Sequence, residues 1–144
     1  MLDKASYDTQ PKCLVALDSI IFGFDGDLLK ILLVKRGPNL HADTWSLMGG
    51  WLNPNENLEQ SAERILFELT GLKGVYLEQL YTFGDINRDP IDRTVSVAYF
   101  ALINIEHYDS KISQAHFAHW FPVSEMPNEL LFDHRQMIDL AIQK

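Results

Sequence analysis

Three positions on one predicted helix determine which chemistry this chain can perform. The segment 58–70, LEQSAERILFELT, spaces its apolar residues like a helix with one buried face. Positions 65, 68 and 69 share one arc of that helix, because residues three and four apart are surface neighbours. Three carboxylates there would converge on one point and suit Mg²⁺ or Mn²⁺, which in turn would bind a diphosphate. The chain instead has Ile65, Glu68 and Leu69.

The residues around that helix follow a regular spacing. The chain reads G-x5-E-x7-R-x3-E-x2-G-L, with its fixed positions at Gly50, Glu56, Arg64, Glu68, Gly71 and Leu72. This pattern resembles the box motif of the Nudix family, without insertion or deletion. In that family a glutamate follows the arginine and two adjacent glutamates precede the final glycine. The resemblance therefore implies a degenerate box, in which Glu68 is the only retained metal-site glutamate.

The missing acids predict that the usual hydrolytic reaction is lost. One carboxylate plus water binds a hard divalent cation weakly. Without the cation, the phosphates are not clamped and no hydroxide is activated. We therefore expect no catalytic residue, no metal site and no cofactor. The alternative is an active pyrophosphohydrolase on ADP-ribose or a related nucleoside diphosphate derivative, which would need Mg²⁺ and carboxylates recruited from Glu78, Asp85, Asp89 or Asp92.

Four box residues are expected to shape the structure rather than to react. The resemblance implies that Glu56 and Arg64 pair and brace the loop against the helix; the alternative is an exposed ion pair of no special role. Gly71 is placed to end the helix, and Gly50 belongs to a double glycine that suits a tight turn.

A degenerate box of this kind resembles one branch of the family, the Nudix-related transcriptional regulators. Three stretches carry that likeness: WSLMGGWL, GDINRDPIDRTVSVAYFALI and LLFDHRQMIDLAIQK. The resemblance implies a non-hydrolytic domain that senses ADP-ribose, another nucleotide sugar or a pentose such as arabinose. It also implies a homodimer that contacts DNA only through a winged helix-turn-helix domain beyond residue 144. A third possibility is a pure interaction module that binds no small metabolite.

Candidate ligand-binding residues lie in loops beside the box. Trp51 follows the double glycine and could stack on a base or sugar, while Asn87 and Asp89 could bond hydroxyls. Arg36 ends a strand near the box entry and could reach an anionic group. The full candidate set is Arg36, Trp51, Asn87, Arg88, Asp89 and Arg93. For the loop that contains residues 87–93, the alternative is a solvated segment with ion pairs among Arg88, Asp89, Asp92 and Arg93.

The elements that must position these residues can be predicted from the pattern of apolar residues. Strands are expected at 13–24, 28–36, 45–50, 75–85, 93–105 and 116–123, the fifth being central in its sheet. Asp25-Gly26 predicts a tight hairpin between the first two. The helix 58–70 should begin with a capping box of Asn57 and Gln60, and a second helix should follow Asp133 as its N-cap.

This order of elements predicts an α+β fold with a mixed sheet covered by helices on both faces, an α/β/α sandwich. The resemblance makes it a Nudix fold. Residues 1–12 form a polar segment, and residues 13–144 form the Nudix-like domain.

Composition narrows the function classes further. The 144 residues carry a formal net charge of -8, which disfavours direct binding of nucleic acid. The apolar stretches are too short to span a bilayer, and the N-terminus lacks a signal-peptide core. A cytoplasmic protein that does not contact a membrane is expected. The single cysteine, Cys13, is expected to be a small buried residue.

Overall fold

A computed structural model describes residues 3–35, 44–108 and 118–144. In chain order, its elements are α1 (Lys4–Asp8), β1 (Leu14–Asp25), β2 (Leu28–Lys35), β3 (Trp45–Ser46), β4 (Met48–Trp51), α2 (Leu58–Thr70), β5 (Glu78–Phe83), β6 (Thr94–Asn104), α3 (Ile105–Tyr108), β7 (Ala118–Pro122), the 3-10 turn η3 (Val123–Glu125) and α4 (His134–Ile142).

The strands form one mixed sheet around β1. The main path runs β3-β2-β1-β6-β5, while β4 pairs with β1 and β7 with β2. The β1–β6 pairing is parallel along the whole of β6, and the other pairings are antiparallel. The predicted central strand is confirmed, since β6 lies between β1 and β5. The predicted hairpin is confirmed as well: Asp25 pairs with Leu28 across a two-residue loop, and Gly26 has a φ of 66°.

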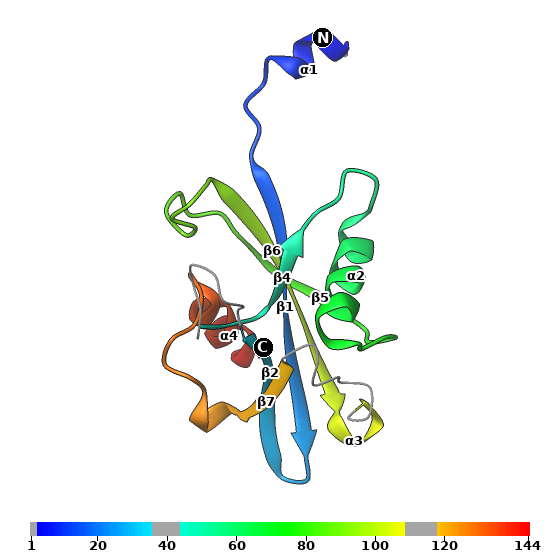
Figure 1. Ribbon diagram of the computed structural model, residues 1–144, viewed down its shortest axis with the longest axis vertical. Helices are drawn as coiled ribbons and strands as arrows, with labels where there is room; N and C mark the ends of the chain where they lie inside the picture. The colour runs from blue at the N-terminus through cyan, green and yellow to red at the C-terminus, as the bar shows by residue number, and fades with distance from the viewer. Residues whose placement is uncertain (1–2, 36–43, 109–117) are drawn as a thin grey trace.

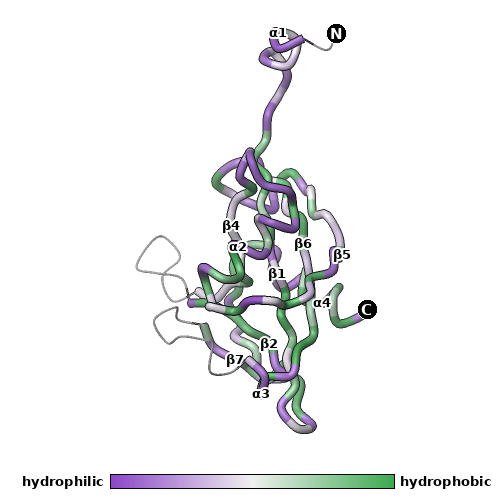
Figure 2. The backbone as a smooth tube through the Cα atoms, turned by 90° about the vertical axis from the view of Figure 1, so that its right-hand side faces the viewer, coloured by the Kyte–Doolittle hydropathy of each residue, from purple (hydrophilic) through white to green (hydrophobic). Residues whose placement is uncertain are grey.

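Helices cover both faces of this sheet (Figure 1). On one face α4 contributes Met137, Ile138 and Ala141 to a core cluster with Ile20 and other strand residues. On the opposite face α2 packs over two further clusters. In Figure 2, hydrophobic residues are frequent along β1 and β2, whereas polar residues predominate in α1. The predicted α/β/α sandwich with a mixed sheet is confirmed.

The helix α2 has the predicted bounds because its ends carry strong local signals. The Asn57 amide donates to the Gln60 side-chain oxygen at 2.8 Å, within a capping box. At the other end Gly71 adopts a left-handed backbone with a φ of 82° and donates its amide to the Phe67 carbonyl at 2.8 Å.

Two sequence predictions were wrong around Leu47 and Asp133. Residues 45–50 form two short strands, because the Leu47 amide donates to His134 Nδ1 at 3.1 Å instead of joining a strand ladder. β3 therefore pairs with β2, and β4 with β1. Asp133 occupies the N-cap position of α4, but its side chain does not cap the helix. Its carboxylate binds Arg88 instead.

The first dozen residues extend away from the sheet, with the short helix α1 at their far end (Figure 1). No residue of α1 is buried. Cys13, expected to be buried, is exposed, because it precedes β1 at the point where the chain leaves the sandwich. Among the described helices, none is long and apolar enough to cross a membrane.

Candidate functional site

The Glu56–Arg64 brace predicted from the box is present. Arg64 Nε lies 3.0 and 3.2 Å from the two Glu56 carboxylate oxygens, and Arg64 Nη2 donates to the Trp51 carbonyl at 2.8 Å. The Ser61 hydroxyl also donates to Glu56 at 2.7 Å. The Ser61 and Arg64 hydrogen bonds lower the pKa of Glu56. This brace connects the end of β4 to the middle of α2.

Of the two apolar residues at the metal positions, Ile65 lies in the core and Leu69 packs against it. Ile65 is 3% exposed and packs in a cluster with Leu17 and Ala62. A Cβ atom on Gly50 would lie 2.8 Å from Ile65 Cγ1, so β4 and α2 meet closely there. Leu69 is partly buried against the same cluster.

The residues present therefore do not fit the divalent metals of a complete box. Glu68, the single retained acid, is mostly exposed and pairs with Arg64 at 3.1 Å. Throughout the described ranges, no group of three or more His, Cys, Asp or Glu side chains is arranged to hold a metal ion. Hard cations of this class need several oxygen ligands in a fixed geometry, and Ile65 and Leu69 offer none.

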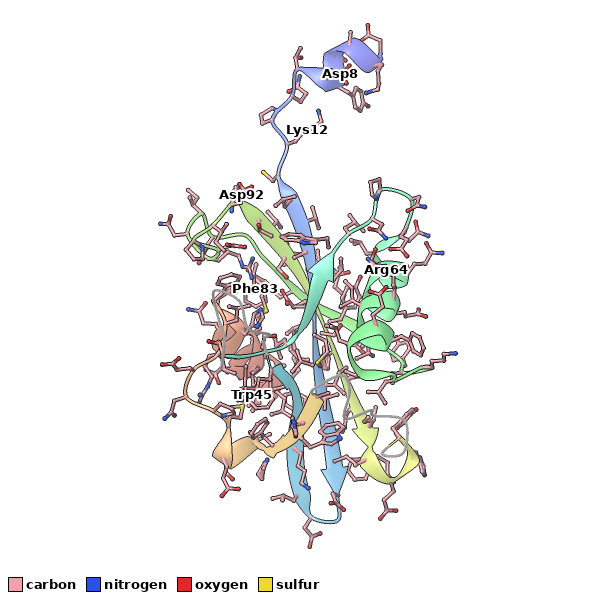
Figure 3. The ribbon with its side chains drawn as sticks, in the orientation of Figure 1. Asp8, Lys12, Trp45, Arg64, Phe83 and Asp92 are labelled. Atoms are coloured by element: carbon pink, nitrogen blue, oxygen red, sulfur yellow. The ribbon has the colours of Figure 1, made fainter. Side chains whose placement is uncertain are left out.

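A cavity of about 520 Å³ opens on the α4 face of the sheet. Its floor includes Leu14, Ala16 and Asp18, which are alternate residues of β1. They point to the same side of β1 as Ile20, which belongs to the core cluster beneath α4. In Figure 3, Arg64 on α2 and Asp92, which lines the cavity, lie on opposite sides of β4. The remaining lining residues come from β3, β4 and the residue between them, from the loop before β6 and the first residue of β6, and from the start of α4 and the segment before it: Ser46, Leu47, Gly49, Gly50, Trp51, Arg88, Asp89, Ile91, Thr94, Leu131, Phe132 and His134.

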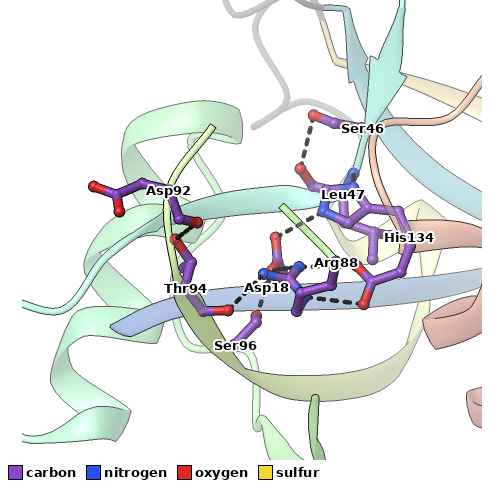
Figure 4. Close-up of polar contacts among 9 residues, drawn as sticks. Asp18, Ser46, Leu47, Arg88, Asp92, Thr94, Ser96 and His134 are labelled. Atoms are coloured by element: carbon purple, nitrogen blue, oxygen red, sulfur yellow. Dashed lines mark hydrogen bonds and ion pairs between the residues drawn. The ribbon is translucent and has the colours of Figure 1, made fainter. Parts of the chain in front are cut away.

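A buried polar network lies at the base of this cavity (Figure 4). Asp18 accepts a hydrogen bond from the Ser96 hydroxyl at 2.5 Å and lies 3.2 Å from His134 Nε2. The Arg88 guanidinium binds Asp133 through two nitrogens at 2.8 and 2.9 Å. Arg88 Nη2 is also 4.0 Å from Asp18. Five residues are thereby fixed relative to one another: they come from β1, β6, the N-terminal end of α4, and residues 84–93 between β5 and β6, here called the polar loop.

The hydrogen bonds of His134 determine its tautomer. Nδ1 accepts the Leu47 amide proton at 3.1 Å, so Nδ1 carries no proton. Nε2 then carries the hydrogen and donates it to Asp18. His134 thus connects the cavity floor to the backbone between β3 and β4.

The charges of the network are mutually stabilised. Burial by itself raises the pKa of Asp18, but His134, the Ser96 hydroxyl and the Arg88 guanidinium lower it on balance below its usual value. Burial likewise disfavours the charged form of Arg88, yet Asp133 and Asp18 raise its pKa overall. The cavity consequently has ionised groups at its base, with three carboxylates (Asp18, Asp89 and Asp92) and one guanidinium among its described lining residues.

The predicted ligand-binding residues separate into three groups. Trp51, Arg88 and Asp89 line the cavity. Asn87 lines a neighbouring hollow that shares Arg88. Arg93 is exposed and donates to the carbonyls of Gly84 and Asp85 at 2.8 and 3.1 Å, so it holds the loop to the end of β5. Arg36 lies outside the described residues.

The alternative of ion pairs within the polar loop does not describe Arg88. Its guanidinium instead reaches Asp133, 45 residues further along the chain, and it is buried. Asp89 and Asp92 bond backbone amides within the loop.

Sequence reasoning missed five residues of the site: Asp18, Ser96, Phe132, Asp133 in its ion-pairing role, and His134. One local signal was available for Asp18, which is an acid within the apolar strand LVALDSIIFGF. A charge in such a run requires a buried partner. Nothing nearby in the sequence identifies that partner, because Ser96 and His134 are distant along the chain.

Comparisons with known proteins agree with this architecture. A NUDIX domain model matches residues 14–141, so the chain belongs to the Nudix family. The chain is 35% identical over 137 residues to the ADPR responsive transcriptional repressor NtrR of Acinetobacter baylyi, covering 93% of this chain and 55% of that protein. It thus spans about half the length of that relative.

Two further comparisons concern ADP-ribose. The NUDIX domain of Shewanella oneidensis NrtR complexed with ADP ribose is 31% identical and superposes with a TM-score of 0.77, covering 99% of this chain and 98% of that domain. An ADP-ribose pyrophosphatase of Methanocaldococcus jannaschii is 30% identical over 125 residues, covering 86% of this chain and 70% of that enzyme.

Proposed function

We propose that this chain is the non-hydrolytic, ligand-sensing Nudix domain of a transcriptional regulator, and that its ligand is ADP-ribose or a closely related nucleoside diphosphate sugar. One observation carries the proposal. The cavity and the Glu56–Arg64 brace are present, whereas two of the three box metal positions are apolar, with Ile65 in the core and Leu69 packed against it. The chain therefore keeps the means to bind such a ligand and lacks the means to cleave it.

The cavity suits a ligand of this class. Its volume of about 520 Å³ lies within the range of pockets that enclose small molecules. Trp51, Ile91 and Phe132 offer apolar surface to a base. Asp89 and Asp92 offer carboxylate oxygens to sugar hydroxyls. Because acids outnumber cations among the described lining residues, the diphosphate should lie away from them, towards the cavity mouth.

The names of the relatives favour ADP-ribose over a pentose. The Acinetobacter relative is described as ADPR responsive, and the Shewanella domain is complexed with ADP ribose. A free pentose such as L-arabinose would use the hydroxyl-binding groups of the cavity and leave most of its apolar surface uncovered.

The regulatory role requires parts beyond this domain. We propose that residues 13–144 form the sensor, that residues 1–12 are a polar extension, and that a winged helix-turn-helix domain follows residue 144 in the whole protein. The acidic net charge of -8 agrees with DNA being contacted by that other domain. A homodimer acting in the cytoplasm would match two-fold symmetric DNA sites.

Calorimetric titration tests the proposal directly. The chain should bind ADP-ribose more tightly than L-arabinose, and ADP-ribose at a hundred times its dissociation constant should add about 2.7 kcal/mol to the free energy of unfolding. Trp51→Leu should weaken binding. Tyr76→Leu, which alters a ring that is 80% exposed and outside the cavity, should not. Absence of ADP-ribose binding would contradict the proposal.

An active ADP-ribose pyrophosphohydrolase is the second candidate, favoured by the identity to the Methanocaldococcus enzyme. It would need Mg²⁺ held by carboxylates from outside the box. Incubation with Mg²⁺ and ADP-ribose should leave the ligand intact if the sensor proposal holds. Steady release of AMP and ribose 5-phosphate would support the hydrolase instead.

A further inference from the structure

Phe132 has an unusual backbone conformation at the wall of the cavity. Its φ is 49°, and it is the only non-glycine residue with a positive φ within the described parts of the chain. A left-handed backbone is unfavourable for a bulky side chain, whereas glycine adopts it readily. Strained residues of this kind concentrate at ligand-binding sites, where the surrounding structure holds them.

The residues on both sides of Phe132 are fixed by strong contacts. The Leu131 amide donates to the Trp45 carbonyl at 3.0 Å. Asp133 is held by the two hydrogen bonds from Arg88. His134 is buried between Asp18 and the Leu47 amide. The ring of Phe132 is therefore presented by a segment that cannot easily relax.

Phe132 borders the cavity and also the neighbouring hollow that Asn87 lines. Its ring meets the His134 ring edge-on, with a centroid separation of 6.4 Å. A partly exposed aromatic ring held rigidly in a cavity wall provides a platform for a flat ligand group at little entropic cost.

We propose that Phe132 is a specificity-determining residue, whose ring stacks on the purine base of the bound ligand. This inference rests on the proposed function and goes beyond it, since it identifies the protein group that recognises the base. In the same scheme Arg88 is a positioning residue, because its nitrogens bind Asp133 and the Thr94 carbonyl, at 3.4 Å, and present Phe132 to the ligand.

The test uses the chain with Phe132→Leu, Phe132→Trp and Phe132→Gly. Stacking of a base on an aromatic ring corresponds to roughly a fivefold to hundredfold change in affinity. Phe132→Leu should weaken ADP-ribose binding by that factor, and Phe132→Trp should retain it. Phe132→Gly relieves the backbone, so it should fold as well as wild type and still bind weakly. This variant separates loss of the ring from loss of the fold.

Two further measurements distinguish stacking from a general packing role. The fluorescence of the ethenoadenine analogue of ADP-ribose should be quenched less on binding to Phe132→Leu than to wild type. Affinity for ribose 5-phosphate, which has no base, should be equal in the two proteins. Tyr81→Leu, which changes a ring that is 59% exposed and outside the cavity, should bind ADP-ribose like wild type.

The outcomes separate the inference from the function on which it rests. If wild type does not bind ADP-ribose, the proposed function and the stacking role are both overturned. If wild type binds ADP-ribose and both Phe132→Leu and Phe132→Gly bind it as tightly as wild type does, only the stacking role is overturned. An equal loss of affinity for ribose 5-phosphate in Phe132→Leu would also overturn it.

Discussion

Arg88 is a buried positive charge that links its loop to β6 and to the start of α4. Its side chain is 3% exposed and that of Asp133 is 11% exposed. Two parallel hydrogen bonds fix the pair in one geometry. Such a pair adds little net stability relative to apolar residues, but the loss of one member leaves a buried charge without compensation.

Arg88→Ala should therefore be strongly destabilising. We expect the free energy of unfolding to fall by about 3–5 kcal/mol, the usual cost of breaking a buried pair from one side. Urea denaturation measures this directly. Arg93→Ala is the matched control, since Arg93 is exposed and contacts only carbonyl groups among its described side-chain partners. A loss below about 1 kcal/mol in Arg88→Ala would contradict the burial of this pair.

Asp18 links stability to acid pH. Its pKa is below 3.8 in the folded state, so the ionised form is favoured by folding. That contribution is fully present above pH 3.8 and is lost as pH falls through the folded-state pKa. Asp18→Asn should be less stable than wild type at neutral pH, and the difference should shrink below pH 3.8. Thermal unfolding from pH 7 to pH 2 measures the difference. Asp139→Asn, at an exposed site, should follow wild type throughout.

At the scale of elements, the face of α2 that would hold metal ions in a complete box instead packs against β4. Gly50 and Ile65 are so close that a Cβ atom on Gly50 would overlap two Ile65 carbons, at 2.8 and 2.9 Å. Because Gly50 has no side chain, β4 can approach the apolar face of α2 closely, and the two elements pack directly against each other.

Gly50→Ala should destabilise the protein by about 1–3 kcal/mol through overpacking. Adding Ile65→Ala removes the carbons that clash, so the double variant should be more stable than the sum of the single changes predicts, by about 0.5–3 kcal/mol. Chemical denaturation of the four proteins of this cycle measures the coupling. Gly84→Ala serves as the control, because among the described residues other than its chain neighbours none has a heavy atom within 4 Å of its Cβ position. Simple additivity would contradict the close contact.

The elements that could be predicted from the sequence are those defined by local signals. The helix α2 was predicted to the residue because Asn57, Gln60 and Gly71 mark its ends. The break between β3 and β4 was not predicted, since it depends on His134, 87 residues from Leu47 along the chain. Asp133 was misassigned for the same reason: its local context indicates a helix cap, but its partner is Arg88.

In the candidate site too, the residues with a local signal could be predicted and those that depend on distant partners could not. Trp51 and Asp89 could be proposed because loops beside a recognisable box are usual places for ligand contacts. The base of the cavity could not, because Asp18 and Ser96 are 78 residues apart. The left-handed backbone of Phe132 could not be predicted either, because phenylalanine rarely adopts that conformation.

At the scale of the whole molecule, the sandwich is self-contained without its first dozen residues. α1 buries no side chain and projects from the sheet (Figure 1). Deletion of residues 1–12 should therefore change the free energy of unfolding by less than about 0.5 kcal/mol, the usual range for changes away from the core. Urea denaturation of the shortened chain measures this. A larger loss would mean that the extension packs against the domain, for example in a dimer.

The parallel pairing of β1 with β6 has a consequence for synthesis on the ribosome. Leu14 lies beside Thr94 and Phe24 beside Asn104, so one long edge of the first strand has no partner until about eighty further residues have emerged. Non-local pairing of this kind slows folding. During that interval, an apolar strand with an open edge is available for association with other chains. We therefore expect nascent chains to need the most protection from aggregation before the sixth strand emerges.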